Sequence, residues 1–126
     1  TKSALLTRGL FEIMQIGVRM GGNPNTFFGL TGMGDLITTC ISEYGRNLKV
    51  GRELGQGKKL KDILSSMEMV AEGVETARSA YQLAQKYGVT AAIISEIYKV
   101  LFQDKSPKQA LEDLMGREAR EELKQY

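Results

Sequence analysis

Two short stretches hold the residues best suited to chemistry, Gly32-Met33-Gly34-Asp35 and Gly45-Arg46-Asn47. Glycines let a ligand approach the backbone closely, and the Asp35 carboxylate can accept a hydrogen bond from a hydroxyl group. The Arg46 guanidinium is a planar fork that matches phosphate oxygens. Arg46 also begins an expected helix, whose unpaired N–H groups and positive dipole end favour an anion. Together these features suit a small phosphorylated polyol.

The same residues also allow a purely structural interpretation. An Asp at a helix start is commonly a cap, and an Arg on a short helix is commonly solvated. Lys49 and Arg52 follow Arg46 at three-residue intervals and extend a basic face. Glu53 interrupts this face and no stacking aromatic residues accompany it, which favours an ordinary charged surface over a nucleic-acid interface.

Acid–base and nucleophilic chemistry have few candidates in this chain. It contains no histidine, so proton transfer would need Lys, Asp or Glu. Lys2 could act as a base if buried, but a surface lysine at a helix start is the favoured interpretation. The single cysteine, Cys40, has no histidine to activate it and suits a small buried position. One cysteine also excludes an internal disulfide and a multi-cysteine zinc site, so we expect no metal and a reducing, cytoplasmic compartment.

Composition indicates one ordinary folded domain over residues 1–126. Hydrophobic residues make up 42% and charged residues 25%, values typical of soluble globular proteins. The formal charge of +2 falls well short of the basic excess of a dedicated nucleic-acid binder. Apolar runs such as residues 91–94 are far shorter than the roughly 20 residues that span a bilayer, so no membrane insertion is expected.

Hydrophobic periodicity predicts that helices position these residues, giving an all-α fold. A long first helix over residues 3–20 should end at Gly21-Gly22, and Asn23-Pro24 should cap a short helix reaching Phe28. Residues 29–35 should form tight turns, and residues 36–41 have competing helix and strand propensities, of which helix is favoured. Further helices are expected over residues 46–54, 60–67, 74–87, 91–102 and 107–114.

Two of these helices carry more specific expectations. The wide apolar face of residues 91–102 marks it as the candidate for the central buried helix. Ser106-Pro107-Lys108-Gln109 has the pattern of a capping box, in which Ser106 and Gln109 would satisfy each other's backbone N–H groups. Beyond residue 116 the chain is strongly charged and should fray or continue as a solvent-facing helix.

The first nine residues, TKSALLTRG, resemble a signature of the NAD(P)-dependent glycerol-3-phosphate dehydrogenases. Further segments resemble segments of this family in the same order, so that the resemblance covers essentially the whole chain. They are residues 29–36, Thr39-Cys40, residues 45–47, 55–57, 70–73 and 114–117. An ordered set of this kind is far more specific than any one motif.

The resemblance implies that residues 1–126 are the C-terminal helical substrate-binding domain of such an enzyme. Its fold would be the multi-helix type of the 6-phosphogluconate dehydrogenase C-terminal domain. The N-terminal Rossmann domain, which carries the main cofactor platform, is not represented, since no strand–glycine–helix fingerprint occurs. The chain, which opens without methionine, is therefore expected to be a fragment.

By the same resemblance, the enzyme would interconvert sn-glycerol 3-phosphate and dihydroxyacetone phosphate by hydride transfer with NAD or NADP, supplying phospholipid synthesis. Asp35 and Thr39 would contact the polyol, and Gly45, Arg46 and Asn47 the phosphate. Arg46, Val70 and Glu72 would approach the cofactor. Many bacterial members have a serine where Gly45 stands.

No catalytic residue is assigned to this chain, because the general-base lysine of the family lies in a Lys-Asn segment upstream. The isolated chain is accordingly expected to be inactive, and the full-length enzyme to be a homodimer. Two alternatives stay open: the substrate domain of another Rossmann-type dehydrogenase acting on a sugar phosphate or hydroxy acid, and a non-catalytic helical interaction module.

Overall fold

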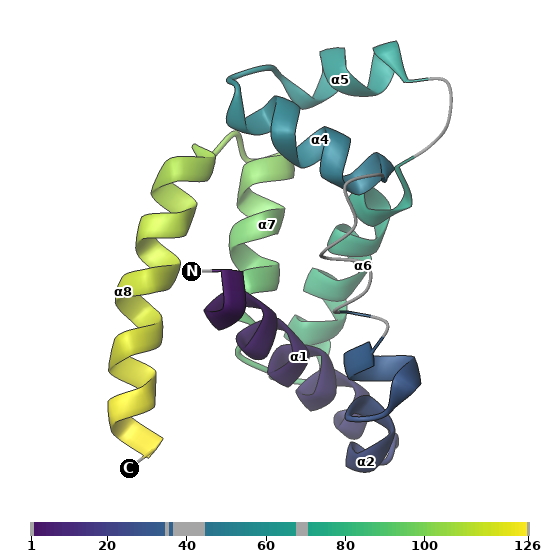
Figure 1. Ribbon diagram of the computed structural model, residues 1–126, viewed down its shortest axis with the longest axis vertical. Coiled ribbons are helices and arrows are strands. Elements are labelled where there is room, and N and C mark those ends of the chain that lie inside the picture. Colours follow the sequence, from purple (N-terminus) through teal and green to yellow (C-terminus); the bar gives the residue numbers. More distant parts are fainter. Residues whose placement is uncertain (1, 35, 37–44, 68–70, 126) are drawn as a thin grey trace.

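The computed structural model describes residues 2–34, 36, 45–67 and 71–125, and all regular structure in these ranges is helical. The all-α expectation is therefore confirmed. Figure 1 shows helices α6 and α7 side by side, with α1 crossing them near one end and α8 running along α7. The elements are α1 (Lys2–Arg19), α2 (Pro24–Phe27), η1 (Leu30–Gly34), α4 (Arg46–Gly55), α5 (Leu60–Ser66), α6 (Glu72–Lys86), α7 (Ala92–Phe102) and α8 (Pro107–Gln125).

The N-terminal part follows the expected pattern. Helix α1 buries Leu10 and Ile16, two residues of its predicted apolar stripe. Asn23 caps α2, because its Oδ1 accepts a hydrogen bond of 2.9 Å from the Asn25 N–H and Pro24 occupies the first turn. The predictions for both helices are confirmed to within two residues.

The glycine-rich segment after α2 differs from the expected series of tight turns. It forms a single wide helical turn, η1, in which the Gly34 N–H donates to the Gly29 carbonyl at 3.1 Å. A Cβ on Gly32 would lie 2.2 Å from the Phe27 carbonyl oxygen, so glycine is needed where this turn closes on the end of α2. Of the helix predicted over residues 36–41, only Leu36 lies within the described residues.

Two clusters of buried side chains hold the helices together. Val50, Ile63, Ala71 and Val74 join α4, α5 and α6 at one end. Ile16, Ala84 and Ala91 join α1, α6 and the start of α7 at the other. Helix α6 contributes to both clusters and thereby fixes the position of α4 relative to α1.

Helix α7 contacts α1, α6 and α8, as a central helix should, but the expectation that it is buried is wrong. None of its residues is buried, and Ile97 is 43% exposed. The reason is that one apolar face of α7 lines an open groove of about 620 Å³ rather than packing against another element. Periodicity locates an apolar face without showing what covers it.

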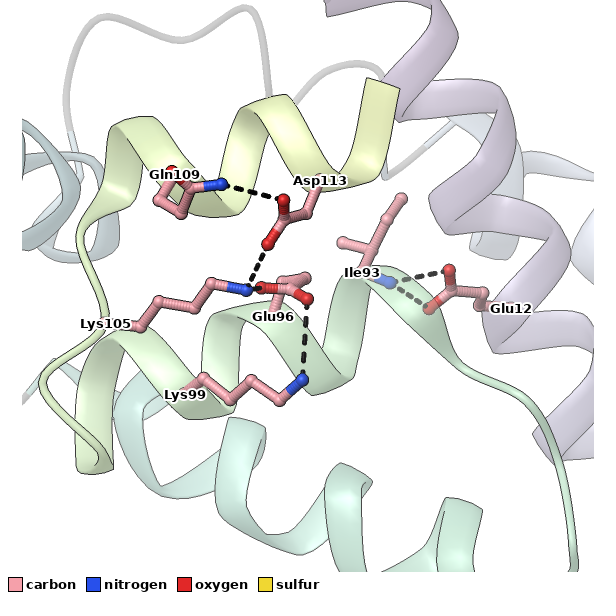
Figure 2. A network of polar contacts seen from close by, with 7 residues as sticks. All are labelled: Glu12, Ile93, Glu96, Lys99, Lys105, Gln109 and Asp113. Carbon is pink, nitrogen blue, oxygen red and sulfur yellow. Dashed lines mark hydrogen bonds and ion pairs between the residues drawn. The ribbon is translucent and has the colours of Figure 1, made fainter. Parts of the chain in front are cut away.

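The N-terminus of α7 is capped by a side chain from another helix (Figure 2). Its N-cap residue is Ala91, which has no hydrogen-bonding side chain. The Glu12 carboxyl group of α1 accepts hydrogen bonds from the Ile93 N–H at 2.8 Å and the Ile94 N–H at 3.2 Å. Glu12 is 0% exposed, and a buried carboxyl group is tolerated here because backbone donors and the positive end of α7 face it.

The capping box predicted at the start of α8 forms only in part. The Gln109 N–H donates to Ser106 Oγ at 3.3 Å, as expected. The Gln109 side chain instead donates from Nε2 to Asp113 Oδ1 at 2.9 Å, so the reciprocal contact to Ser106 is replaced by one along the helix. Helix α8 extends to Gln125, so of the two outcomes expected beyond residue 116 the chain continues as a helix.

A network of charged side chains ties the α7–α8 turn to both helices (Figure 2). Lys105 Nζ donates to Glu96 on α7 and, at 2.7 Å, to Asp113 Oδ2 on α8. Hydrogen bonds from Lys105 and then Gln109 hold the pKa of the Asp113 carboxyl below its ordinary value of 3.8. Hydrogen bonds to Asp113 and Glu96 likewise raise the pKa of Lys105.

The lowered pKa of Asp113 predicts an acid-dependent contribution to stability. Since the unfolded chain protonates this carboxyl near 3.8 and the folded chain only at lower pH, the contribution is present above 3.8 and is lost as the pH falls through the folded pKa. Asp113→Asn should therefore flatten the loss of stability below about pH 4, measured as the urea midpoint of the purified chain. Equal slopes for wild type and Asp113→Asn would disprove the assignment.

Within the described residues, no helix is long and apolar enough to cross a membrane. No group of three or more His, Cys, Asp or Glu residues in that part of the chain could hold a metal ion.

Candidate functional site

The N-terminus of α4 presents unpaired backbone donors beside a cation. The first intrahelical bond runs from the Lys49 N–H to the Gly45 carbonyl at 3.1 Å, and Gly45 provides no side-chain cap. The first N–H groups of the helix, up to that of Leu48, therefore have no partner within it. Arg46 is exposed and makes no hydrogen bond or ion pair with another described residue. An anion approaching this end would meet both donor types.

The backbone conformation at residue 45 does not require glycine. Its φ of 164° is extended and open to any residue, and a Cβ there would meet no atom within 4 Å. A serine would therefore fit the same backbone at this position.

The N-terminus of α6 lies directly against that of α4. The Gly73 N–H donates to Asn47 Oδ1 at 3.1 Å, across 26 residues of sequence. This contact brings Asn47, predicted to bind substrate, to the residue that follows Glu72, predicted to approach the cofactor. Two positive helix ends side by side repel each other unless negative charge lies near them, and the exposed Glu72 in the first turn of α6 supplies part of it. The arrangement favours an additional anion.

The structure thus gathers four of the predicted site residues, Gly45, Arg46, Asn47 and Glu72, at two adjacent helix ends. Asp35, Thr39 and Val70 lie outside the described residues, as does Cys40. Their assigned roles remain predictions. Sequence reasoning placed Gly73 in a motif but did not identify its contact with Asn47, because no local pattern signals it.

The basic face of α4 is partly neutralised. A hollow of about 300 Å³ beside this helix is lined by Gly45, Leu48, Lys49, Arg52, Glu53 and Gln56. Glu53 lies among the cations, and its Oε1 pairs with Lys58 Nζ at 3.0 Å. This mixture of charges agrees with the ordinary charged surface favoured from the sequence.

The apolar groove begins at the same place. Asn47 and Gly73 belong to its lining, which continues between α4, α6, α7 and α8 and is almost entirely apolar. Three hydrophobic side chains along it are well exposed: Ile13 at 44%, Ile97 at 43% and Leu111 at 39%. The polar helix ends therefore adjoin a large uncovered apolar surface.

Comparison with known proteins identifies the family of this chain. The family described as NAD-dependent glycerol-3-phosphate dehydrogenase C-terminus matches residues 1–112. The chain is 57% identical over 122 residues to a glycerol-3-phosphate dehydrogenase [NAD(P)+] of Lysinibacillus sphaericus, covering 97% of this chain and 36% of the relative. A protein of the same name from Syntrophobacter fumaroxidans is 50% identical over 123 residues, covering 98% and 36%.

A solved structure shares the fold as well. The crystal structure of glycerol-3-phosphate dehydrogenase from Coxiella burnetii superimposes with a TM-score of 0.85 at 33% identity, covering 90% of this chain and 35% of that one. The chain spans little more than a third of the length of the relatives it matches. On this evidence, the chain belongs to the family of C-terminal domains of NAD-dependent glycerol-3-phosphate dehydrogenases.

Proposed function

We propose that residues 1–126 form the substrate-binding domain of a glycerol-3-phosphate dehydrogenase, which interconverts sn-glycerol 3-phosphate and dihydroxyacetone phosphate with NAD or NADP. The observation that carries the proposal is the pairing of the α4 and α6 N-termini through Asn47 and Gly73, with exposed Arg46 beside them. Arg46, Asn47 and the first N–H groups of α4 would hold the phosphate, with the Gly45 backbone contributing. Asp35 and Thr39 would contact the polyol end.

Holding the phosphate would serve catalysis by fixing one end of a small substrate. Binding energy from the non-reacting phosphate then aligns the carbon that gains or loses hydride. The general-base lysine is not assigned to this chain. The contribution of residues 1–126 is to orient the substrate, so the isolated chain should show no turnover.

Two of the described residues would contact the outer part of a nicotinamide dinucleotide. The Glu72 carboxylate can accept a hydrogen bond from a carboxamide, and Arg46 can pair with a phosphate oxygen of the dinucleotide. Val70 would line the same side. The dinucleotide, when bound, would accept or supply the hydride, and its main platform would lie in an N-terminal Rossmann domain.

The apolar groove supports a covering partner within the same enzyme. Ile13, Ile97 and Leu111 are exposed along this groove, and a contiguous apolar lining of this kind is typical of a surface that a partner covers. We assign the cover to the N-terminal part of the enzyme, which would place the cofactor near the Asn47 end of the groove. A homodimer in the cytoplasm, acting in glycerophospholipid metabolism, completes the proposal.

A chimera tests this function directly. The chain replaces the matching 122 residues of the Lysinibacillus sphaericus relative, to which it is 57% identical. We expect the chimera to oxidise NADH or NADPH with dihydroxyacetone phosphate at a rate within about tenfold of the relative itself, a barrier difference of roughly 1.4 kcal/mol. The isolated chain, assayed in parallel, should be inactive.

The assay also separates the two alternatives. A folded chimera that prefers a sugar phosphate or a hydroxy acid would indicate another dehydrogenase domain. A folded chimera with no activity on any of these substrates would contradict an enzymatic role and favour an interaction module.

A further inference from the structure

Helix α6 cannot be capped by its own N-cap residue. That residue is Ala71, which is 1% exposed and packs with Val50, Ile63 and Val74 in the buried cluster. A polar side chain at this position would have to enter the core without a hydrogen-bond partner, which is unfavourable. The cap is supplied by Asn47 of α4, whose Oδ1 accepts from the Gly73 N–H at 3.1 Å.

The Asn47 amide group occupies the space where a Gly73 side chain would begin. A Cβ added to Gly73 would stand 2.6 Å from Asn47 Oδ1, 2.7 Å from Cγ and 2.8 Å from Nδ2. These nearly equal distances mean that the amide plane covers the place where a side chain would begin. Since Oδ1 faces a backbone donor, the orientation of the amide is fixed and Nδ2 is left as the donating atom.

We infer that Gly73 is a positioning residue for the substrate, acting through Asn47. This rests on the proposed function, in which Asn47 Nδ2 donates to the substrate phosphate. Because Gly73 has no side chain, the amide can cap α6 and present Nδ2 in one fixed orientation. The same contact links the N-terminus of α4, which would bind the phosphate, to Glu72, which would approach the cofactor. The two binding regions therefore keep a fixed relative position.

Gly73→Ala in the chimera tests this inference. The new methyl group cannot displace the α6 backbone, so Asn47 must rotate away and lose its fixed orientation. We expect the KM for dihydroxyacetone phosphate to rise about tenfold, the effect of one hydrogen bond to a charged group, with kcat changed less than about threefold. Gly116→Ala is the matched control, because a Cβ there meets nothing within 4 Å.

The double variant Asn47→Ala/Gly73→Ala separates positioning from a general structural need. Asn47→Ala alone should raise KM by losing the donor. In that background the clash no longer exists, so adding Gly73→Ala should raise KM no further and should not lower the melting temperature below that of Asn47→Ala.

Every outcome of this cycle bears on the inference. If Gly73→Ala alone fails to fold but the double variant folds, the clash with Asn47 is the cause and the inference holds. An equal rise in KM in both backgrounds, an unchanged KM for Gly73→Ala, or failure of both variants to fold would overturn it. A folded wild-type chimera without phosphate-dependent turnover would instead overturn the proposed function, and the inference with it.

Discussion

Arg46→Ala in the chimera is expected to lower kcat/KM for dihydroxyacetone phosphate by about 10²–10³-fold. Loss of a two-pronged, charge-assisted contact to phosphate removes roughly 3–4 kcal/mol, since single hydrogen bonds to charged groups contribute about 1.5–3. Arg46 is exposed at the first turn of α4, beside unpaired backbone donors, so its removal should affect binding without unfolding the domain. Steady-state kinetics at constant ionic strength provide the measurement.

Arg52→Ala is the matched control for that variant. Arg52 is an exposed arginine on the same helix and lies in the hollow that contains Glu53. Its removal should change kcat/KM less than about threefold, as expected for a solvated surface charge. A similar loss for both variants would indicate a diffuse electrostatic effect rather than a specific grip.

Glu12→Ala is expected to destabilise α7 strongly. Glu12 is 0% exposed, and its removal leaves the N–H groups of Ile93 and Ile94 without their acceptors beside a new cavity. Two unsatisfied donors and the lost volume correspond to about 3–5 kcal/mol. Hydrogen exchange of the α7 amides in the chimera measures the local loss.

Two further substitutions test whether the effect of Glu12→Ala comes from loss of the α7 cap. Glu12→Gln keeps one acceptor oxygen and should cost about half as much. Glu75→Ala removes an exposed acid from α6 that pairs with Arg78 at the surface, and should leave exchange of α7 within about 0.5 kcal/mol. An Ile93 amide that stays fully protected in Glu12→Ala would show that the cap does not hold α7.

Most helix boundaries follow the sequence prediction because capping residues, prolines and terminating glycines act on the residues next to them. Asn23 with Pro24 starts α2, and Gly88, with φ of 67°, ends α6 as expected of a left-handed C-terminal residue. Where the cap comes from elsewhere in the chain, the pattern offers no signal: Ala71 and Ala91 precede helices that are capped by Asn47 and Glu12. The amphipathic face of α7 was likewise visible in the sequence, but its exposure depends on what covers the groove.

The candidate site was predicted partly by chemistry and mainly by resemblance. Physical chemistry marked Gly45-Arg46-Asn47 at the N-terminus of α4 as a candidate anion site but left the structural interpretation open, and the family motifs favoured the site and added Glu72. Only the fold shows that Asn47 lies beside Glu72, because Asn47 contacts Gly73, the residue that follows Glu72. Asn47 and Gly73 are 26 positions apart in the sequence and are brought together by the packing of α4 and α5 around a shared core. Hydrophobic periodicity does not encode such a contact.

Selectivity for the phosphate group tests the central claim most directly. The measurement is kcat/KM for dihydroxyacetone phosphate relative to unphosphorylated dihydroxyacetone, in the wild-type chimera and in Arg46→Ala. We expect Arg46→Ala to lose far more activity on the phosphorylated substrate than on dihydroxyacetone, for which only the contact between Arg46 and the dinucleotide is lost, so that the ratio falls by about 10²-fold. A ratio that is the same in both proteins would show that the N-terminus of α4 does not hold the phosphate.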